Sequence, residues 1–366
     1  MGTTNYNKRF KVKVYCATFN HAQYITDALN GFTMQKTNFP FICTIFDDCS
    51  TDEEKNVIMQ YLHENFELED KNAFRNEEKD DYVLVFARHK TNHNCFFAVY
   101  FLKYNHYSIN KGFRKDEYCK EFVEYIPYTA LCEGDDYWID PMKLQKQVDY
   151  LEAHPECTLV CNRTKIKSEK YLSFMDDNCC LNNDGVLDAK DVIRKGGLYI
   201  STCSLIYRSS LTSFYPEYCK KCHVGDYPLQ ILAAMKGSVY YLNDPMSVYR
   251  VNNPMSWVGR TASKSIKESY LKGTRTEVDM LKGFATEYTN YRSVFFQRIG
   301  FFITSVIYNY RNDLQSAKLI KDEYQDDINC FCLLWKLRVF FISHNLCGLR
   351  KLYSFFFNCF IKPKFE

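Results

Sequence analysis

Two adjacent carboxylates, Asp135 and Asp136, lie in the segment EGDDYW at residues 133–138, directly after the apolar run at 128–132. Because neighbouring like charges repel, a fold that holds both at the end of a buried strand usually provides a cation, and hard divalent cations prefer carboxylate oxygens. A surface turn explains the same segment equally well, since Gly and Asp are common turn formers. The strands and loops predicted on either side of this segment distinguish a metal site from a turn.

Two further polar loops follow predicted strands. Residues 11–18 form a β-branched and aromatic run that ends before Asn20, and residues 41–46 form a second run that ends at an acidic loop around Asp48. Helical patterns follow both loops, and strands separated by helices predict a mainly parallel sheet with helices on both faces. Ligands bind at the carboxyl ends of such strands. We therefore expect the loops around Asn20, Asp48 and Asp136 to share one rim of the sheet.

The rest of the chain gives a coarse order of elements. We predict a loop at 67–81, a strand at 82–87, a helix at 96–104, an insertion at 105–124, a strand at 128–132, a helix from 144 to about 154, and strands at 159–162 and 239–242 around a helix at 230–235. From about 264 to 325, apolar residues recur at helical spacing. We therefore expect an α/β domain over residues 1–258 and a helical region over 259–366.

The composition is that of an ordinary globular protein. The chain has 366 residues, of which 46% are hydrophobic and 25% charged, and its net charge of +3 arises from 47 basic and 44 acidic residues. This balance does not indicate a nucleic-acid partner. The N-terminus lacks an apolar segment typical of a signal peptide. We therefore expect a cytoplasmic protein, acting in solution or at the inner face of the cell membrane.

The 17 cysteines are odd in number and spread over a long chain, and several lie in apolar runs. Buried reduced thiols fit this pattern better than a disulfide scaffold. Cys219 and Cys222, followed by His223, have a spacing typical of metal ligands, but no second pair completes four zinc ligands. A zinc site is therefore the weaker interpretation.

Four motifs stand in a fixed order: ATFN at 17–20, DDCSTD at 47–52, GDDYW at 134–138 and GDYPL at 225–229. This ordered set resembles the family 2 glycosyltransferases of the GT-A fold, of the type that assembles bacterial surface polysaccharides, over roughly residues 10–258. The resemblance implies an inverting enzyme that moves a sugar from a nucleotide-sugar donor to a glycan or lipid-linked glycan acceptor. It makes a UDP-sugar the first candidate for the donor.

The same resemblance implies roles for residues that bind the donor. Ala17 and Phe19 would contact the nucleotide through the main chain, and Asp48 would accept a hydrogen bond from the pyrimidine ring. Asp135 would hold the ribose or the donor sugar, and Asp136 would bind Mn or Mg. A divalent cation suits this reaction because it stabilises the negative charge that develops on the leaving diphosphate.

Two further residues complete the implied site. Asp226 looks like the general base that takes the proton of the acceptor hydroxyl. Without the resemblance, it is more simply a helix N-terminal residue. Arg250 is either a phosphate partner or part of a salt bridge at the sheet rim. Tyr137 is left open between core packing and a platform for the sugar, whereas Trp138 is expected to pack in the core.

The segment 251–257 departs from the family pattern, because it lacks the His and the glycines that relatives place there. This departure supports an alternative in which the chain is a catalytically silent scaffold or assembly protein at the membrane. A nucleotidyltransferase is a lesser alternative, since the loop at 20–23 is not rich in Gly, Arg or Lys.

The tail at 330–365 is dense in aromatic and aliphatic residues and carries several Lys and Arg side chains. A basic aromatic segment of this kind can lie in the interface of an anionic membrane. The alternative is a helical pair that closes the core or forms a homodimer.

Overall fold

The computed structural model describes residues 10–70, 73–109, 114–253, 266–310, 313–331, 335–337 and 339–340. Contacts within the chain define two compact units. The first contains residues 1–192, 197–215 and 229–260, and the second contains residues 193–196, 216–228 and 261–366.

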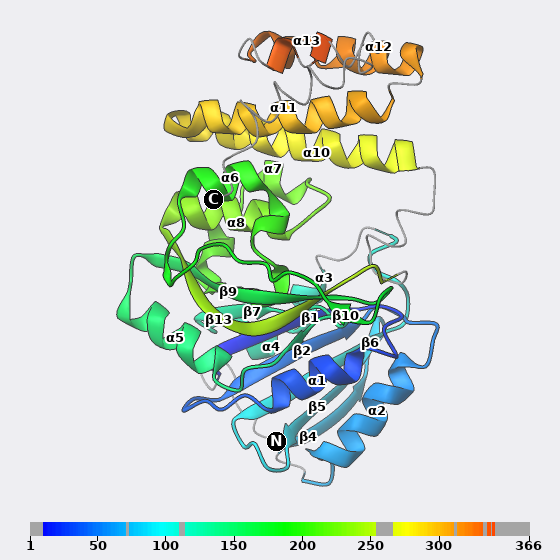
Figure 1. Cartoon of the computed structure of the whole chain (residues 1–366). Helices are drawn as coiled ribbons and strands as arrows, with labels where there is room; N and C mark the ends of the chain where they lie inside the picture. The colour runs from blue at the N-terminus through cyan, green and yellow to red at the C-terminus, as the bar shows by residue number, and fades with distance from the viewer. Residues whose placement is uncertain are drawn as a thin grey trace. The chain divides into compact units, whose positions relative to one another are not determined.

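The first unit is built on a mixed sheet whose centre is parallel (Figure 1). Strand β1 (Val12–Thr18) pairs in parallel with β2 (Phe41–Asp47) on one side and with β7 (Tyr128–Leu131) on the other. Strand β2 in turn pairs in parallel with β6 (Cys95–Leu102). The predicted mainly parallel arrangement is therefore confirmed, and the carboxyl ends of these strands meet at one rim.

Antiparallel strands extend both sides of this centre. On one side, β12 (Ile206–Arg208) runs antiparallel to β7 and to β9 (Cys157–Ser168), and β9 pairs in parallel with β13 (Ser238–Val251). On the other side, β5 (Tyr82–His89) runs antiparallel to β6. Short strands complete the sheet: β3 (Phe66–Glu67), β4 (Phe74–Glu78), β8 (Tyr137–Trp138), β10 (Ser173–Phe174) and β11 (Gly185–Val186).

Helices cover both faces of the sheet, as predicted. One core cluster joins the sheet to α1 (Ile25–Thr33), α2 (Glu54–Asn65) and α5 (Lys143–Ala153), and the other joins it to the segment around α3 (Arg114–Tyr118) and α4 (Lys120–Val123). Alternate residues of β2 point to opposite faces: Cys43 and Ile45 enter the first cluster, and Ile42 and Phe46 the second. This alternation follows from the two-residue period of a strand.

Two predicted elements are wrong. Residues 96–104 were expected to form a helix, but residues Cys95–Leu102 form β6 and are buried along their whole length. A strand covered on both faces reads as a continuous apolar run, which periodicity alone does not distinguish from a buried helix. The predicted loop at 67–81 contains β4, whose polar residues pair with β5 and are largely accessible to solvent.

The second unit is helical, in agreement with the pattern read from residue 264 onward. Its long helices are α10 (Ile266–Glu287) and α11 (Arg292–Asn309), followed by α12 (Leu314–Glu323) and α13 (Gln325–Asn329). The second unit also contains α7 (Glu217–Lys220) and a 3-10 turn at Thr289–Tyr291. Helices α6 (Ala189–Lys195) and α8 (Asp226–Lys236) are divided between the two units, and the 3-10 turns at Gly197–Tyr199, Thr202–Ser204 and Ser209–Phe214 belong to the first. Among the described helices, none combines the length and apolar character needed to cross a membrane.

Candidate functional site

Three loops meet at the carboxyl ends of β1, β2 and β7. The N–H of Asp48 donates to the carbonyl oxygen of Thr18 (2.9 Å), and the N–H of Gly134 donates to that of Ala17 (3.1 Å). The N–H of Asn20 donates to Oγ of Ser50 (2.9 Å). The shared rim predicted from the order of the motifs is therefore confirmed.

Gly134 allows the loop after β7 to approach β1 closely. A Cβ atom at this position would lie 2.1 Å from Oγ1 and 2.6 Å from Cβ of Thr18. Side chains do not tolerate such distances, so the position requires glycine. This contact fixes the start of the loop that carries Asp135 and Asp136.

Glu133, Asp135 and Asp136 place carboxylate oxygens within 4.8 Å of one another. Glu133 is exposed, whereas the two aspartates are buried. Burial raises the pKa of Asp136 well above its usual range, and the neighbouring carboxylate of Asp135 raises it further. Such a cluster is unfavourable without a positive charge, because each ionised carboxylate opposes the others.

The two carboxylate oxygens of Asp136 have different surroundings. Oδ1 accepts a hydrogen bond from the N–H of Arg250 (2.8 Å). Oδ2 is buried and accepts no hydrogen bond within the described part of the chain. Buried polar atoms nearly always have a hydrogen-bond or metal partner, so this oxygen is available to bind a ligand that the described residues do not supply. Carboxylate oxygens are the ligands preferred by Mg²⁺ and related hard cations, so the residues present fit such an ion.

Asp135 is tied into the rim by its main chain and its side chain. Its Oδ2 accepts a hydrogen bond from Nδ2 of Asn253 (3.3 Å) and lies 3.7 Å from Nε2 of His21. Its carbonyl oxygen accepts a hydrogen bond from Nη1 of Arg250 (2.6 Å). Neither His21 nor Asn253 belongs to a motif with a distinctive spacing, so the sequence alone does not reveal these contacts.

Arg250 forms the salt bridge that the sequence left as one of two alternatives. Its side chain is buried, Nε donates to Oε1 of Glu169 (2.9 Å), and Nη2 pairs with the carboxylate of Asp27. Together with its bonds to Asp135 and Asp136, these contacts make Arg250 a support for the acidic loop. Its role as a phosphate partner stays a prediction.

The two aromatic residues of the motif differ in environment. The ring of Tyr137 is half-buried and lies 4.5 Å from the guanidinium carbon of Arg250. Trp138 is buried, packs edge-on against Phe32, and donates its indole N–H to the carbonyl oxygen of Cys203 (2.8 Å). The packing role expected for Trp138 is confirmed.

Asp48 holds the start of the predicted insertion at 105–124. Its Oδ1 accepts the N–H of His106 (2.7 Å), and its Oδ2 accepts the N–H of Tyr107 (3.1 Å). Nζ of Lys115 lies 3.3 Å from Oδ2, and both side chains are almost fully buried. The insertion therefore reaches the rim, while the contact between Asp48 and a pyrimidine stays a prediction.

Ala17 and Phe19 lie at the carboxyl end of β1. Ala17 is the penultimate residue of β1, Phe19 follows the strand, and both are half-buried. Asn20 then adopts a left-handed conformation (φ 59°), which asparagine tolerates better than most residues. The turn begins directly after the proposed main-chain contacts, which are themselves untested.

Glu54 is a buried carboxyl group that the sequence did not reveal. Its Oε2 accepts hydrogen bonds from the N–H of His21 (3.0 Å) and from Oγ of Ser50 (2.7 Å), and its Oε1 accepts one from Oγ1 of Thr18. Burial outweighs these bonds and raises the pKa of Glu54 to about 7. An acidic residue in the first turn of a helix is normally explained by the helix dipole, so its type and position gave no signal of burial.

Asp226 is the first residue of α8, and its Oδ1 accepts the N–H of Tyr227 (2.8 Å). The simpler interpretation of a helix N-terminal residue is therefore confirmed, while its role as base stays a prediction. Asp226 belongs to the second unit. There, burial raises the pKa of Glu277 to about 7; the guanidinium of Arg298 opposes this rise, and the charge of Asp226 adds to it.

Two other predicted regions lie largely or partly outside the described residues. Of the departing segment, the structure describes 251–253 but not 254–257, so Trp257 is outside it. Of the tail at 330–365, it describes 330–331, 335–337 and 339–340.

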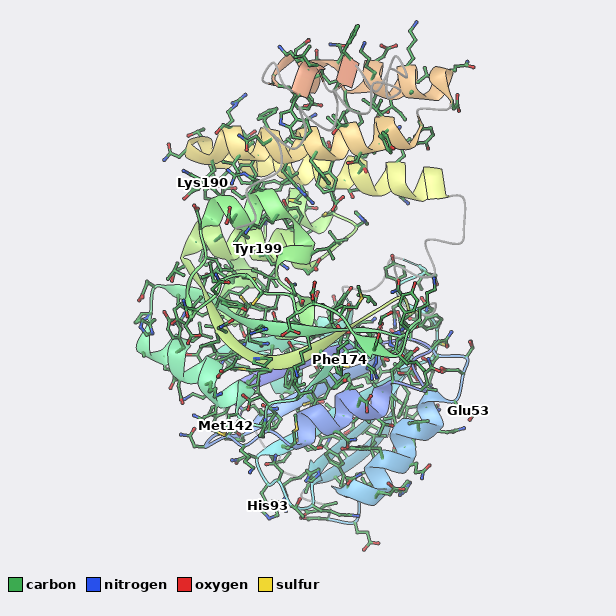
Figure 2. All side chains as sticks on the ribbon, in the orientation of Figure 1. Glu53, His93, Met142, Phe174, Lys190 and Tyr199 are labelled. Carbon is green, nitrogen blue, oxygen red and sulfur yellow. The ribbon has the colours of Figure 1, made fainter. Side chains whose placement is uncertain are left out.

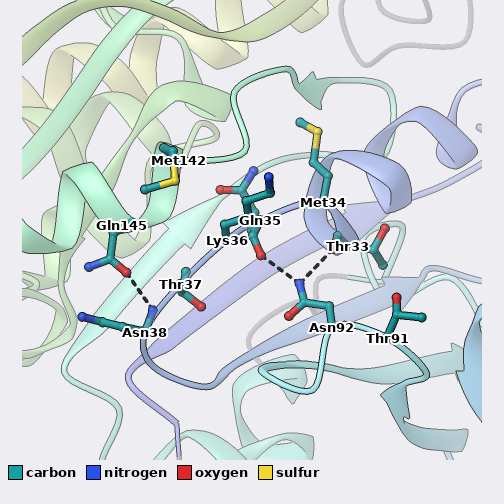
Figure 3. A pocket seen from close by; sticks show the side chains of 10 residues that line it. All are labelled: Thr33, Met34, Gln35, Lys36, Thr37, Asn38, Thr91, Asn92, Met142 and Gln145. Atoms are coloured by element: carbon teal, nitrogen blue, oxygen red, sulfur yellow. Dashed lines mark hydrogen bonds between the residues drawn. The ribbon is translucent and has the colours of Figure 1, made fainter.

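An open pocket lies at the amino ends of the parallel strands, next to the starts of β2 and β6 (Figure 3). Its polar groups hold neighbouring loops together: Nδ2 of Asn92 donates to the carbonyl oxygens of Thr33 (2.9 Å) and Gln35 (2.8 Å), and the N–H of Asn38 donates to Oε1 of Gln145 (2.8 Å). Lys36 is the only charged residue among those that line the pocket. The acidic rim is therefore the stronger candidate for chemistry.

Comparison with known proteins gives partial matches. No family model matches the chain. The chain is 29% identical over 247 residues to the uncharacterized proteins Rv1520 of Mycobacterium tuberculosis and Mb1547 of Mycobacterium bovis. The match covers 65% of this chain and 58% of each relative, so the chain spans little more than half the length of the curated relatives it matches.

Two solved structures show a distant likeness. TarS 1-349 of S. aureus in complex with UDP-GlcNAc is 14% identical, with 92% of each chain covered and a TM-score of 0.49. The mannosyltransferase PcManGT from Pyrobaculum calidifontis in complex with GDP-Man and Mn2+ is 11% identical, with 97% of this chain and 85% of that chain covered and a TM-score of 0.46.

Proposed function

We propose that this chain is a metal-dependent, inverting glycosyltransferase that moves a sugar from a nucleotide-diphosphate sugar, most simply a UDP-sugar, to a glycan or lipid-linked glycan. The observation that carries the proposal is the buried Oδ2 of Asp136, which lacks a donor within the described residues and lies in a cluster with Glu133 and Asp135. The cluster stands at the carboxyl edge of a parallel sheet, where such folds bind ligands.

Asp136 would hold Mn or Mg, with Glu133 as a further oxygen ligand. When bound, the cation supplies positive charge that stabilises the diphosphate as it leaves. The N–H of Arg250 holds Oδ1 of Asp136, which leaves the other oxygen for the cation. Removal of either Asp136 or this support would therefore weaken metal binding.

The donor contacts follow the order of the loops. Ala17 and Phe19 would bind the nucleotide through the main chain, Asp48 would accept from the base, and Asp135 would contact the ribose or sugar. Asp48 already accepts hydrogen bonds from His106 and Tyr107, so it would also order the segment beside the base. A carboxylate has enough lone pairs for both tasks.

Asp226 would act as the general base. Its carboxylate would take the proton of the acceptor hydroxyl while that oxygen attacks the anomeric carbon, and the bond from that carbon to the diphosphate oxygen would break. Attack from the side opposite the leaving group inverts the anomeric centre.

Two alternatives remain as outcomes of experiment. A catalytically silent scaffold is favoured by the segment at 251–257, which lacks the family's His and glycines. A nucleotidyltransferase would release pyrophosphate rather than a nucleoside diphosphate. Peripheral membrane contact through 330–365 and a homodimer also stay predictions.

The test is turnover of a panel of UDP- and GDP-sugars by the full chain, with and without Mn²⁺. We expect metal-dependent release of the nucleoside diphosphate from one donor class. In the presence of an acceptor, Asp226→Asn should keep donor affinity and lower transfer by about 100-fold or more, the usual range for loss of a general base. Asp244→Asn serves as the control, because Asp244 is an exposed partner of Lys146. Folded protein that neither binds nor turns over any donor would contradict the proposal.

A further inference from the structure

The turn between β9 and β10, together with the last residue of β10 and the residue after it, carries a cluster of exposed apolar side chains. Tyr171, Leu172, Phe174 and Met175, here called the hairpin tip, are between 52% and 77% exposed; Phe174 is labelled in Figure 2. Leu172 has a left-handed conformation (φ 50°), which is uncommon for a leucine and marks the turn. Single exposed apolar residues are common, but a compact group of them indicates an interaction surface.

Lysines accompany the hairpin tip. Nζ of Lys170 lies 5.1 Å from the centre of the Tyr171 ring, and Nζ of Lys165 lies 5.7 Å from that of Phe174. These distances place each ammonium group beside an exposed aromatic ring, as in a cation–π contact. The cluster therefore presents apolar and positively charged groups together.

The nearby acidic groups are largely neutralised by internal partners. Glu169 shares Arg250 with Asp27 and also lies 3.7 Å from Nζ of Lys167. Asp177 pairs with Arg163 (2.7 Å). Asp176 is exposed, but Lys165 and Lys170 outnumber it. The surface that surrounds the hairpin tip is therefore complementary to an anionic one.

The hairpin is joined to the acidic rim by a short chain of contacts. The N–H of Glu169 donates to the carbonyl oxygen of Val251 (2.9 Å), and the carboxylate of Glu169 accepts from Arg250, whose own N–H holds Asp136. Only Lys170 separates Glu169 from the hairpin tip in sequence. A surface that engages the tip would consequently lie near the candidate metal site.

We propose that the hairpin tip docks on the surface of an anionic lipid bilayer and so brings the acidic rim to acceptors held there. The inference rests on the proposed function for its purpose, but the docking itself is independent of catalysis. Aromatic side chains favour the interface between headgroups and acyl chains, and lysines are attracted to anionic lipids. So few residues give weak, reversible binding rather than permanent anchoring.

The test is co-sedimentation of the full chain with vesicles of pure phosphatidylcholine and of an equal mixture with phosphatidylglycerol. The double variant Leu172→Ser/Phe174→Ser should lose at least about tenfold in partitioning to the mixed vesicles, because it removes two apolar contacts. Lys165→Gln and Lys170→Gln should each reduce binding about fivefold, and only with the anionic vesicles. The matched control is Leu198→Ser/Phe214→Ser, two similarly exposed residues (82% and 58%) that do not belong to the hairpin tip.

Several results would overturn the docking proposal. They are absence of wild-type binding to mixed vesicles, equal losses in the tip and control variants, or unchanged binding of the tip variant, which would assign the contact to another segment. Loss of a concentration-dependent dimer in the tip variant, without vesicle binding by wild type, would assign the tip to a second copy of the chain. Circular dichroism checks that each variant folds. Metal-dependent donor turnover without vesicles is measured separately, so failure of the enzymatic proposal is distinguishable from failure of docking.

Discussion

Asp136 and Glu54 are buried carboxyl groups on the same rim, but their hydrogen bonds differ. The carboxylate of Glu54 accepts from Thr18, His21 and Ser50. Asp136 has one oxygen held by a main-chain N–H and another with no donor among the described residues. Burial raises the pKa of both groups. Burial is therefore common to both residues, and the number of hydrogen-bond donors distinguishes them. Glu54, which has three donors among the described residues, holds the loops together, whereas Asp136, which has one, can also bind a cation.

The raised pKa of Glu54 predicts a pH-dependent stability. Its pKa is about 7 in the folded chain against an ordinary value of 4.5, so the folded state binds the proton more tightly than the unfolded state. The favourable contribution of this proton is complete below about pH 4.5 and is lost as the pH rises through about 7. Relative to Glu54→Gln, wild type should lose up to about 3 kcal/mol over this interval.

Urea unfolding of wild type and Glu54→Gln at several pH values measures this difference. Glu53→Gln is the matched control, because Glu53 is the exposed neighbour of Glu54. A difference between wild type and Glu54→Gln that stays constant with pH would show that the pKa of Glu54 is the same in the folded and the unfolded chain, which contradicts the prediction.

At the scale of elements, the approach of the loop after β7 to the end of β1 sets the position of the acidic pair. Gly134→Ala would place a methyl group against Thr18, which is itself bonded to Glu54. We expect a loss of about 1 to 3 kcal/mol in the free energy of unfolding, the usual cost of overpacking. Gly225→Ala is the control, since a Cβ atom there meets nothing within 4 Å. Equal stability of the two variants in thermal or urea unfolding would mean that the loop after β7 moves away from Thr18 without a loss in the free energy of unfolding.

The elements also show how far sequence reasoning reaches. Alternating strands and helices predicted the rim correctly because parallel strands place their carboxyl ends together. The same reasoning misassigned β6, since a strand buried on both faces has no alternation. It also missed Glu54, whose burial depends on the contact of α2 with the loop after β1. Arg250 remained open because spacing does not reveal that Asp27 and Glu169 meet its side chain.

At the scale of the whole molecule, the chain combines a mixed, centrally parallel α/β unit with a helical unit. The order of motifs along the chain predicted the loops that carry Asn20, Asp48 and Asp136, and these loops do meet. The sequence does not establish whether Asp226 is a general base, because a helix N-terminal aspartate and a general base can have the same local sequence. The central claim is therefore the metal site, which the arrangement of the acidic rim supports most directly.

Titration of the full chain with Mn²⁺, followed by electron paramagnetic resonance in the presence of UDP, tests this claim. Wild type should bind the ion, and Asp136→Asn should weaken binding by at least about tenfold, the loss typical even for a residue that only supports a ligand. The variant should remain folded, because the replacement preserves shape and keeps an acceptor for the N–H of Arg250. Asp140→Asn, at a residue paired with Lys146, should bind as wild type does. Equal Mn²⁺ affinity in wild type and Asp136→Asn would contradict the metal site.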